Sequence, residues 1–141
     1  MKRFPLLLAL MVLCCCARPD TQDFFVPRSE AAGGVYDFQF ALEDSLSTYD
    51  FLFYTRVDGA WENNIRMDAR WLSPEGKSYS ETVYLAPEDS DGIARMYRSG
   101  VVPASYGDWK LSVSISSAPS GFRGLGLILQ KNGTRQTEEI R

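Results

Sequence analysis

From Val35 onward, apolar and polar side chains alternate along the chain with a period of two, the pattern of strands that bury one face. The alternation is clearest at 65–71 and 109–115, where Arg, Asp, Lys or Ser occupies the polar positions. Such strands are typical of antiparallel sheets with one face on a core and the other in water. Segment 49–57 is apolar on nearly both faces, so we expect it in a central position. Residues 36–42, 78–85 and 125–131 complete six predicted strands.

Turn signals separate these strands. Residues 73–76 read Ser-Pro-Glu-Gly, which suits a hairpin, and Asn132-Gly133 suits a tight turn into a short final strand. Segment 93–102 is ambiguous between a short helix and an irregular strand, because glycine and proline interrupt its helical pattern. Short strands joined by turns predict one all-β domain at 35–141. We expect an antiparallel β-sandwich of seven or eight strands, with jelly-roll or immunoglobulin-like topology.

Residues 16–34 precede this domain and show no sustained periodicity, with prolines, glycines and mixed charge. This composition predicts a tether between the lipidated cysteine and the domain. Phe24, Phe25 and Val26 interrupt it. We expect them to form an edge strand or a plug packed on the domain, because adjacent exposed phenylalanines promote aggregation.

The first fifteen residues have the features of an export signal. Lys2 and Arg3 are followed by an apolar run that is too short to span a bilayer. The run ends in Leu13-Cys14-Cys15-Cys16, which resembles the bacterial lipobox, where an aliphatic residue stands three places before a lipidated cysteine. Residues 1–15 are therefore predicted to be a lipoprotein signal peptide and Cys16 the lipidated residue. Cys15, with Val12 in the aliphatic position, is the alternative.

Lipidation at Cys16 would determine where the protein is located and whether the mature chain can form a disulfide. Several acyl chains on Cys16 would hold the protein stably on a bilayer without spanning it. The predicted location is therefore the bacterial cell envelope, in the inner or the outer membrane. Because all three cysteines lie in the first sixteen positions, a chain starting at Cys16 has no thiol pair for an intrachain disulfide. Its fold must then depend on core burial alone.

Composition excludes several functions. Eighteen acidic residues outnumber fifteen basic ones, which argues against a nucleic-acid partner. The absence of histidine removes the Ser-His-Asp triad, the histidine general base and imidazole metal sites. Paired carboxylates are the remaining catalytic option, but Glu43, Asp44, Glu62 and Asp68 fall at turns or beside arginines, as solvated ion pairs do. We therefore predict no enzymatic activity and no cofactor.

Segment 87–92 gathers three carboxylates before a glycine. Asp89 and Asp91 are weak candidates for a Ca²⁺ site, because Ca²⁺ prefers hard oxygen ligands. An acidic turn between two strands is the preferred interpretation, since a complete calcium loop would need further ligands downstream.

Aromatic residues are abundant, and most of them fall on faces predicted to be buried. Trp71 and Trp109 are in phase with core aliphatic residues and are predicted to pack in the core. Trp61 and Tyr106 fall in turns and are the candidates for large exposed rings that could contact a glycan or a protein partner. Capping of the core is the preferred role for both rings.

A series of short motifs adds a family resemblance. They are Tyr36-Asp37-Phe38, Tyr54-Thr55-Arg56, Asn63-Asn64-Ile65, Ser73-Pro74-Glu75-Gly76, Leu85-Ala86, Tyr106-Gly107-Asp108-Trp109-Lys110-Leu111 and Gly124-Leu125-Gly126-Leu127-Ile128-Leu129. Together they resemble the gliding-motility-associated lipoproteins of the GldH type in the Bacteroidetes envelope. The resemblance implies a lipoprotein without catalytic residues that serves, with other anchored subunits, surface motility or the linked secretion apparatus.

The sequence thus favours a non-enzymatic envelope lipoprotein that holds protein partners through its sheet faces or edges. The first alternative is a surface glycan-binding module, which requires Trp61 and Tyr106 on one flat patch. A second is an assembly or inhibitory factor that uses a protruding loop at 87–93.

Overall fold

The computed structural model describes residues 20–86 and 93–132. The strands are β1 (Thr21–Pro27), β2 (Val35–Leu42), β3 (Thr48–Val57), β4 (Ile65–Leu72), β5 (Ser78–Leu85), β6 (Arg95–Val101), β7 (Gly107–Ser114) and β8 (Phe122–Asn132). Two 3-10 turns, η1 (Arg28–Glu30) and η2 (Ala32–Gly34), connect β1 to β2. Within these ranges, no helix is both long and apolar enough to cross a membrane.

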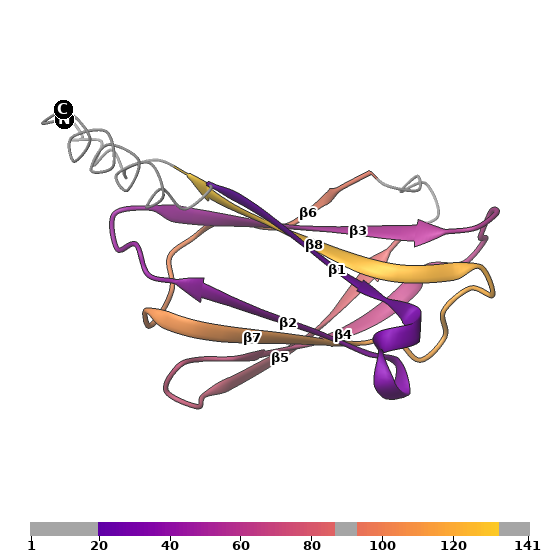
Figure 1. Ribbon diagram of the computed structural model, residues 1–141, viewed down its shortest axis with the longest axis horizontal. Coiled ribbons are helices and arrows are strands. Elements are labelled where there is room, and N and C mark those ends of the chain that lie inside the picture. The colour runs from indigo at the N-terminus through magenta and orange to yellow at the C-terminus, as the bar shows by residue number, and fades with distance from the viewer. Residues whose placement is uncertain (1–19, 87–92, 133–141) are drawn as a thin grey trace, which may run out of the picture.

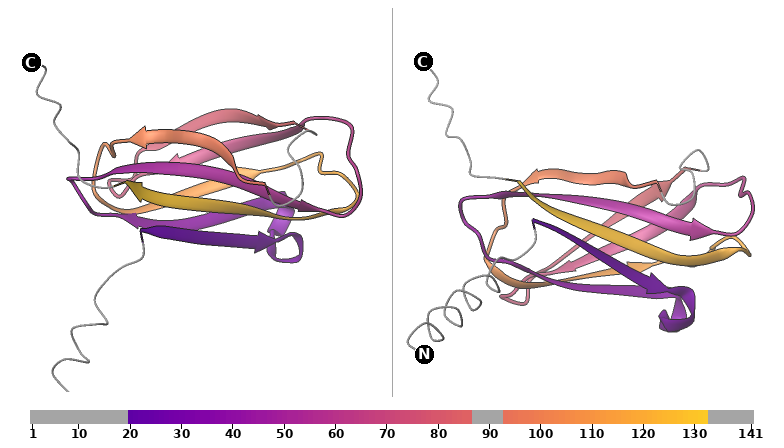
Figure 2. Two further views of the ribbon diagram at one scale, coloured as in Figure 1. Left: turned by 90° about the horizontal axis from the view of Figure 1, so that it is seen from above. Right: turned by 45° about the horizontal axis from the view of Figure 1, so that its top comes forward.

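The eight strands form two antiparallel four-stranded sheets packed as a sandwich in a single domain, which confirms the predicted fold class (Figure 1). Sheet A has the order β1-β8-β3-β6 and sheet B the order β2-β7-β4-β5. Figure 2, seen from above, shows the strands of sheet A side by side in this order. Of the two predicted topologies, this strand order is that of the jelly roll.

All six predicted strands are present, and β3 lies inside sheet A, as expected for its apolar faces. The ambiguous segment 93–102 forms the irregular strand: β6 pairs with β3 through two register shifts. Gly100, which has φ +61°, donates its N–H to the Asp50 carboxylate at 2.7 Å. The predicted final strand after Asn132 lies outside the described residues.

The packed domain begins earlier than the predicted boundary at Val35. Strand β1 lies within the segment expected to be a tether and pairs with β8 from Thr21 to Pro27. Phe24 and Val26 pack on the core, which confirms the edge-strand alternative for this apolar stretch. The tether prediction is therefore wrong for 21–34, because inward-facing apolar residues on β1 complete sheet A.

The core lies between the sheets and consists of alternate residues from both. Its most deeply buried members are Phe38, Phe51, Phe53, Ile65, Met67, Leu111, Val113, Leu125 and Leu127. Trp109 is buried and Trp71 packs against the core, as predicted. Rings also meet across the sheets, since Phe51 lies edge-on to Trp71 with centroids 5.0 Å apart. This core joins the two sheets without a disulfide among the described residues.

The outer face of sheet A carries its own aromatic layer. The rings of Phe25 and Tyr54 stack with centroids 6.0 Å apart and cover two glycines of β8, Gly124 and Gly126. The Tyr54 hydroxyl donates to the Asp23 carboxylate at 2.6 Å. Burial and this hydrogen bond raise the pKa of Tyr54 to about 12. The glycines are required here because any side chain on them would occupy the space of the rings.

The sandwich has two distinct ends. We call the end where β1 begins and β8 ends the terminal end; it also carries loops 43–47, 73–77 and 102–106, at the left in Figure 1. Pairing of Leu42 with Gly107 and of Thr48 with Asn132 places these strand ends together. We call the opposite end, with loops 58–64 and 115–121, the distal end.

We expect Gly126→Ala to lower the free energy of unfolding by about 1–3 kcal/mol, because the new methyl group would overlap the ring of Tyr54. Urea denaturation measures the change. In a Tyr54→Ser background, the same alanine is expected to cost almost nothing, since the overlapping ring is gone. An equal loss in both backgrounds would contradict the proposed packing.

Candidate functional site

Several predicted site residues lie outside the described residues: Cys15, Cys16, Asp89 and Asp91. The same applies to most of the loop at 87–93. In the part of the chain that the structure describes, no group of three or more His, Cys, Asp or Glu residues could hold a metal ion.

The two candidate surface rings, Trp61 and Tyr106, lie at opposite ends of the sandwich. Trp61, in the distal loop between β3 and β4, is partly buried against the core and lines a hollow with residues 117–119. Its indole N–H is buried and has no hydrogen-bond partner among the described residues. Tyr106, at the terminal end, is 42% exposed. Strand β7 separates the two ends by roughly 25 Å, so the structure does not bring the rings together on one platform.

A different surface combines aromatic side chains with free backbone: the side of the sandwich where β5, the edge of sheet B, lies against β6, the edge of sheet A. Tyr97 of β6 stacks on Trp71 with centroids 6.0 Å apart and accepts a hydrogen bond from its indole N–H at 3.1 Å. The Tyr97 hydroxyl and the Arg98 guanidinium both donate to the Glu81 carboxylate on β5. We call Glu81, Tyr97 and Arg98 the edge cluster.

The edge cluster lies between two hollows, of which the one toward the terminal end is the more apolar and the other also includes Arg95. The one toward the terminal end has a volume of about 320 Å³, and its lining includes Leu42, Phe51, Trp71, Tyr79, Val101, Val102, Pro103 and Trp109. The one toward the distal end has a volume of about 310 Å³, and its lining includes Phe53, Val83, Tyr84, Leu85, Met96 and Tyr97. Each hollow could accept an apolar side chain, and neither contains a catalytic set of residues.

The backbone of β5 is regular and open. It pairs with β4 without a register shift, and among the described strands it pairs with no other. One row of its N–H and C=O groups therefore points away from sheet B, where a further strand can pair. The other edge on this side, β6, is broken by register shifts and carries Arg95 and Arg98. Bulges and charges of this kind discourage pairing, so β5 is the better edge for a partner.

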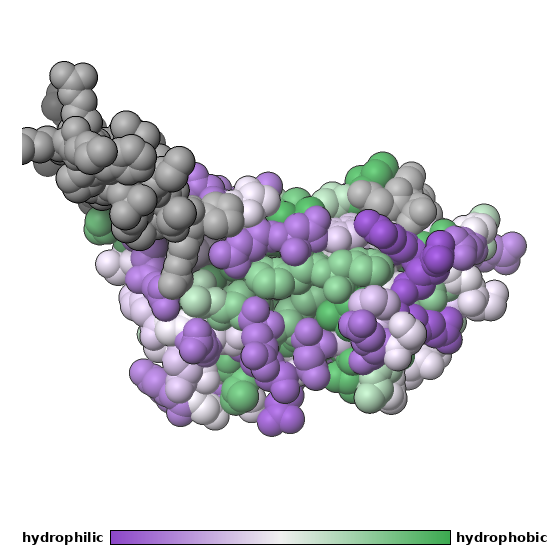
Figure 3. Space-filling view, viewed as in Figure 1, coloured by the Kyte–Doolittle hydropathy of each residue, from purple (hydrophilic) through white to green (hydrophobic). Residues whose placement is uncertain are grey.

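The opposite side of the sandwich is organised differently. There β1, the edge of sheet A, lies beside β2, the edge of sheet B, and we call the line between them the seam. Phe24 contacts Phe40 across it with ring centroids 6.4 Å apart. Figure 3 views this side and shows apolar surface between rows of hydrophilic side chains.

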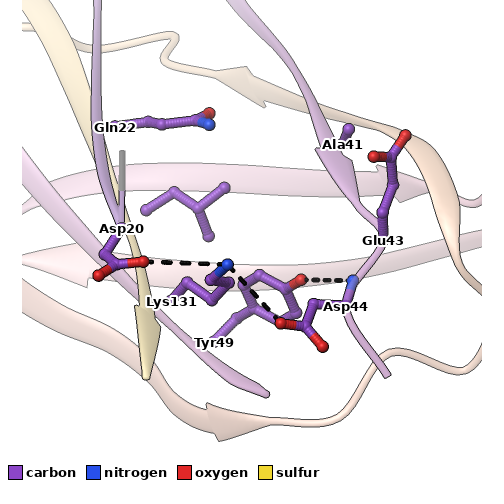
Figure 4. A pocket seen from close by; sticks show the side chains of 8 residues that line it. Asp20, Gln22, Ala41, Glu43, Asp44, Tyr49 and Lys131 are labelled. Atoms are coloured by element: carbon purple, nitrogen blue, oxygen red, sulfur yellow. Dashed lines mark hydrogen bonds and ion pairs between the residues drawn. The ribbon is translucent and has the colours of Figure 1, made fainter. Parts of the chain in front are cut away.

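At the terminal end of this seam lies a polar pocket of about 390 Å³ (Figure 4). Lys131 stands between the carboxylates of Asp20 and Asp44, at 3.9 and 3.6 Å. The Asp44 carboxylate also accepts the Leu46 N–H at 2.9 Å and the Ser47 hydroxyl at 2.8 Å. These hydrogen bonds hold the pKa of Asp44 below its usual value. The group thus stays ionised and shapes the 43–47 loop, and it does not provide the raised pKa of a general acid.

Sequence reasoning missed the β5 edge because it looked for exposed rings in loops. Tyr79 and Tyr84 are 48% and 59% exposed, yet both lie on the strand itself. A signal was present: residues 78–85 place Ser, Thr or Tyr at most positions and a glutamate on the inward face. Polar side chains and inward charges of this kind are typical of edge strands.

A scan of the chain against protein-family models gives no match, and a search of curated proteins finds no similar sequence.

We expect Glu81→Ala to lower the free energy of unfolding by about 1–2 kcal/mol, because Tyr97 and Arg98 would lose their shared acceptor. Urea denaturation again gives the value. Glu75→Ala is the matched control, since Glu75 forms an exposed ion pair with Lys77 at 3.8 Å, and loss of this pair should cost less than about 0.5 kcal/mol. Equal effects of the two substitutions would show that the edge cluster does not hold the two edges together.

Proposed function

We propose that this protein is a non-enzymatic lipoprotein of the bacterial cell envelope that binds other envelope proteins through the edge of strand β5. The observation that carries the proposal is the regular, open edge of β5, which lies beside two hollows lined largely by aromatic and aliphatic side chains. The acyl chains on Cys16, or on Cys15 in the alternative, would hold this edge at the membrane surface.

Strand addition is the mode of binding that this edge favours. An extended segment of a partner would pair its backbone with β5, and main-chain hydrogen bonds would supply affinity. Side chains on one face of that segment would lie over the hollows beside Tyr79 and Tyr84 and supply specificity. Glu81 presents no obstacle, because Tyr97 and Arg98 already satisfy its carboxylate.

The resemblance to the GldH type extends this proposal to a particular setting. It would make the protein one subunit of an assembly for surface motility or the linked secretion apparatus. This step rests on the short motifs of the sequence alone. The glycan-binding alternative requires Trp61 and Tyr106 on one patch, and their positions at opposite ends of the sandwich favour the protein-binding function instead.

Photo-crosslinking in the native envelope tests the proposed edge. A photoreactive side chain in place of Ser80, which is exposed on β5, should crosslink to a fixed set of envelope proteins. Mass spectrometry of the crosslinked products would identify them. The expectation follows because a strand paired with β5 would lie within a few ångströms of position 80.

Ser114 provides the matched control. It is also an exposed serine in sheet B, but it lies on the inner strand β7 and so cannot contact an added strand. A photoreactive side chain there should not capture the same proteins. If position 80 captures nothing, or if both positions capture the same proteins equally, the β5 proposal fails.

A further inference from the structure

Exposed apolar side chains gather at the terminal end of the sandwich. Of the eight large apolar residues that the structure leaves exposed, five belong to this end. Their relative exposures are 64% for Leu46, 38% for Leu72, 48% for Tyr79, 46% for Val102 and 42% for Tyr106. They come from four separate segments of the chain, and pairing of the strand ends brings those segments together. Single exposed apolar residues are common, but their concentration on one end marks a contact surface.

The same end is the one nearest to the proposed anchor. Only residues 17–19 separate Cys16 from Asp20, which precedes β1. A fully extended chain from Cys16 to Asp20 spans at most roughly 14 Å. A domain tethered so briefly would hold the start of β1, and with it the terminal end, close to the acyl chains.

The lysines at this end are paired with carboxylates, which bears on the type of lipid surface that it can contact. Lys131 is bracketed by Asp20 and Asp44, and Lys77 is paired with Glu75. No cluster of free lysines is thus present in the described loops of this end to attract anionic lipids. Contact would depend on insertion of apolar side chains among neutral headgroups, where tyrosine is also favoured.

From these observations we infer that the terminal end of the sandwich rests on the bilayer, with Leu46, Val102 and Tyr106 inserted at the headgroup level. The inference rests on the proposed anchor at Cys16 and adds a second, non-covalent contact to it. Because the strands run from the terminal to the distal end, the domain would stand upright on the membrane. The edge of β5 would then rise from the lipid surface, accessible to partners from the side (Figure 1).

Fluorescence quenching on the complete acylated protein tests this contact. The protein is reconstituted in phosphatidylcholine vesicles, and a fluorophore is attached to Leu46→Cys or Val102→Cys. Asn63→Cys, in the exposed distal loop between β3 and β4, is the control. All three side chains are exposed, so the substitutions should leave the core intact. Circular dichroism checks that each variant is folded.

We expect the labels at positions 46 and 102 to be quenched severalfold more by a nitroxide-bearing lipid than the label at position 63. Aqueous iodide should show the reverse order. The pattern should persist at high salt, because apolar insertion is insensitive to screening.

Other outcomes overturn the inference in distinguishable ways. If the protein floats with the vesicles but iodide quenches all three labels equally, the anchor stands and the domain does not rest on the lipid. If the protein does not float with the vesicles, the anchor fails as well. If protection from iodide requires high protein density or added envelope proteins, a second copy or a protein partner covers this end, and the bilayer does not.

Discussion

Burial of alternating side chains between the two sheets is the interaction on which the rest of this structure depends. With no cysteine among the described residues, apolar packing in place of a disulfide holds most of sheet A against sheet B. Strand β1 completes that packing, because Phe24 and Val26 cover the core beside β8. The positions of the ends and edges follow from this arrangement. The strands run from end to end, so the loops gather at two ends, and each sheet has two outer strands.

This geometry assigns adjoining surfaces to the two proposed roles. The terminal end carries the start of β1 and five exposed apolar side chains, which suit contact with lipid. The β5 side carries a regular open edge and two hollows, which suit an extended segment of another protein. Between the hollows, the edge cluster joins the two sheets and leaves the backbone of β5 free. The two surfaces meet at Tyr79 and Val102, which line the hollow nearer the terminal end and also belong to its exposed apolar set.

The sequence predicted the strands well because burial of one face imposes a period of two, which Ile65 to Trp71 and Trp109 to Ile115 display directly. It offered an edge strand or a plug only at residues 24–26 and placed the rest of β1 in a tether, because the pairing of Thr21 with Gln130 joins residues far apart in the chain. The candidate site was missed for a related reason. Whether Tyr79 or Tyr84 is exposed depends on β5 being an edge strand, and the polar residues of 78–85 indicate an edge without showing which strands lie beside it. Trp61 packs against the core, which is the role that its sequence context favoured.

The central claim is that the domain is held at a membrane by acyl chains on the cysteine that begins the mature protein. Mass spectrometry of the N-terminal peptide, taken from protein isolated in its native membrane, tests it most directly. The account predicts that the chain begins at Cys16 and that this residue carries the acyl chains; the same result at Cys15 would move the site by one position and leave the account unchanged. An N-terminus without acyl chains, at any residue, would contradict it.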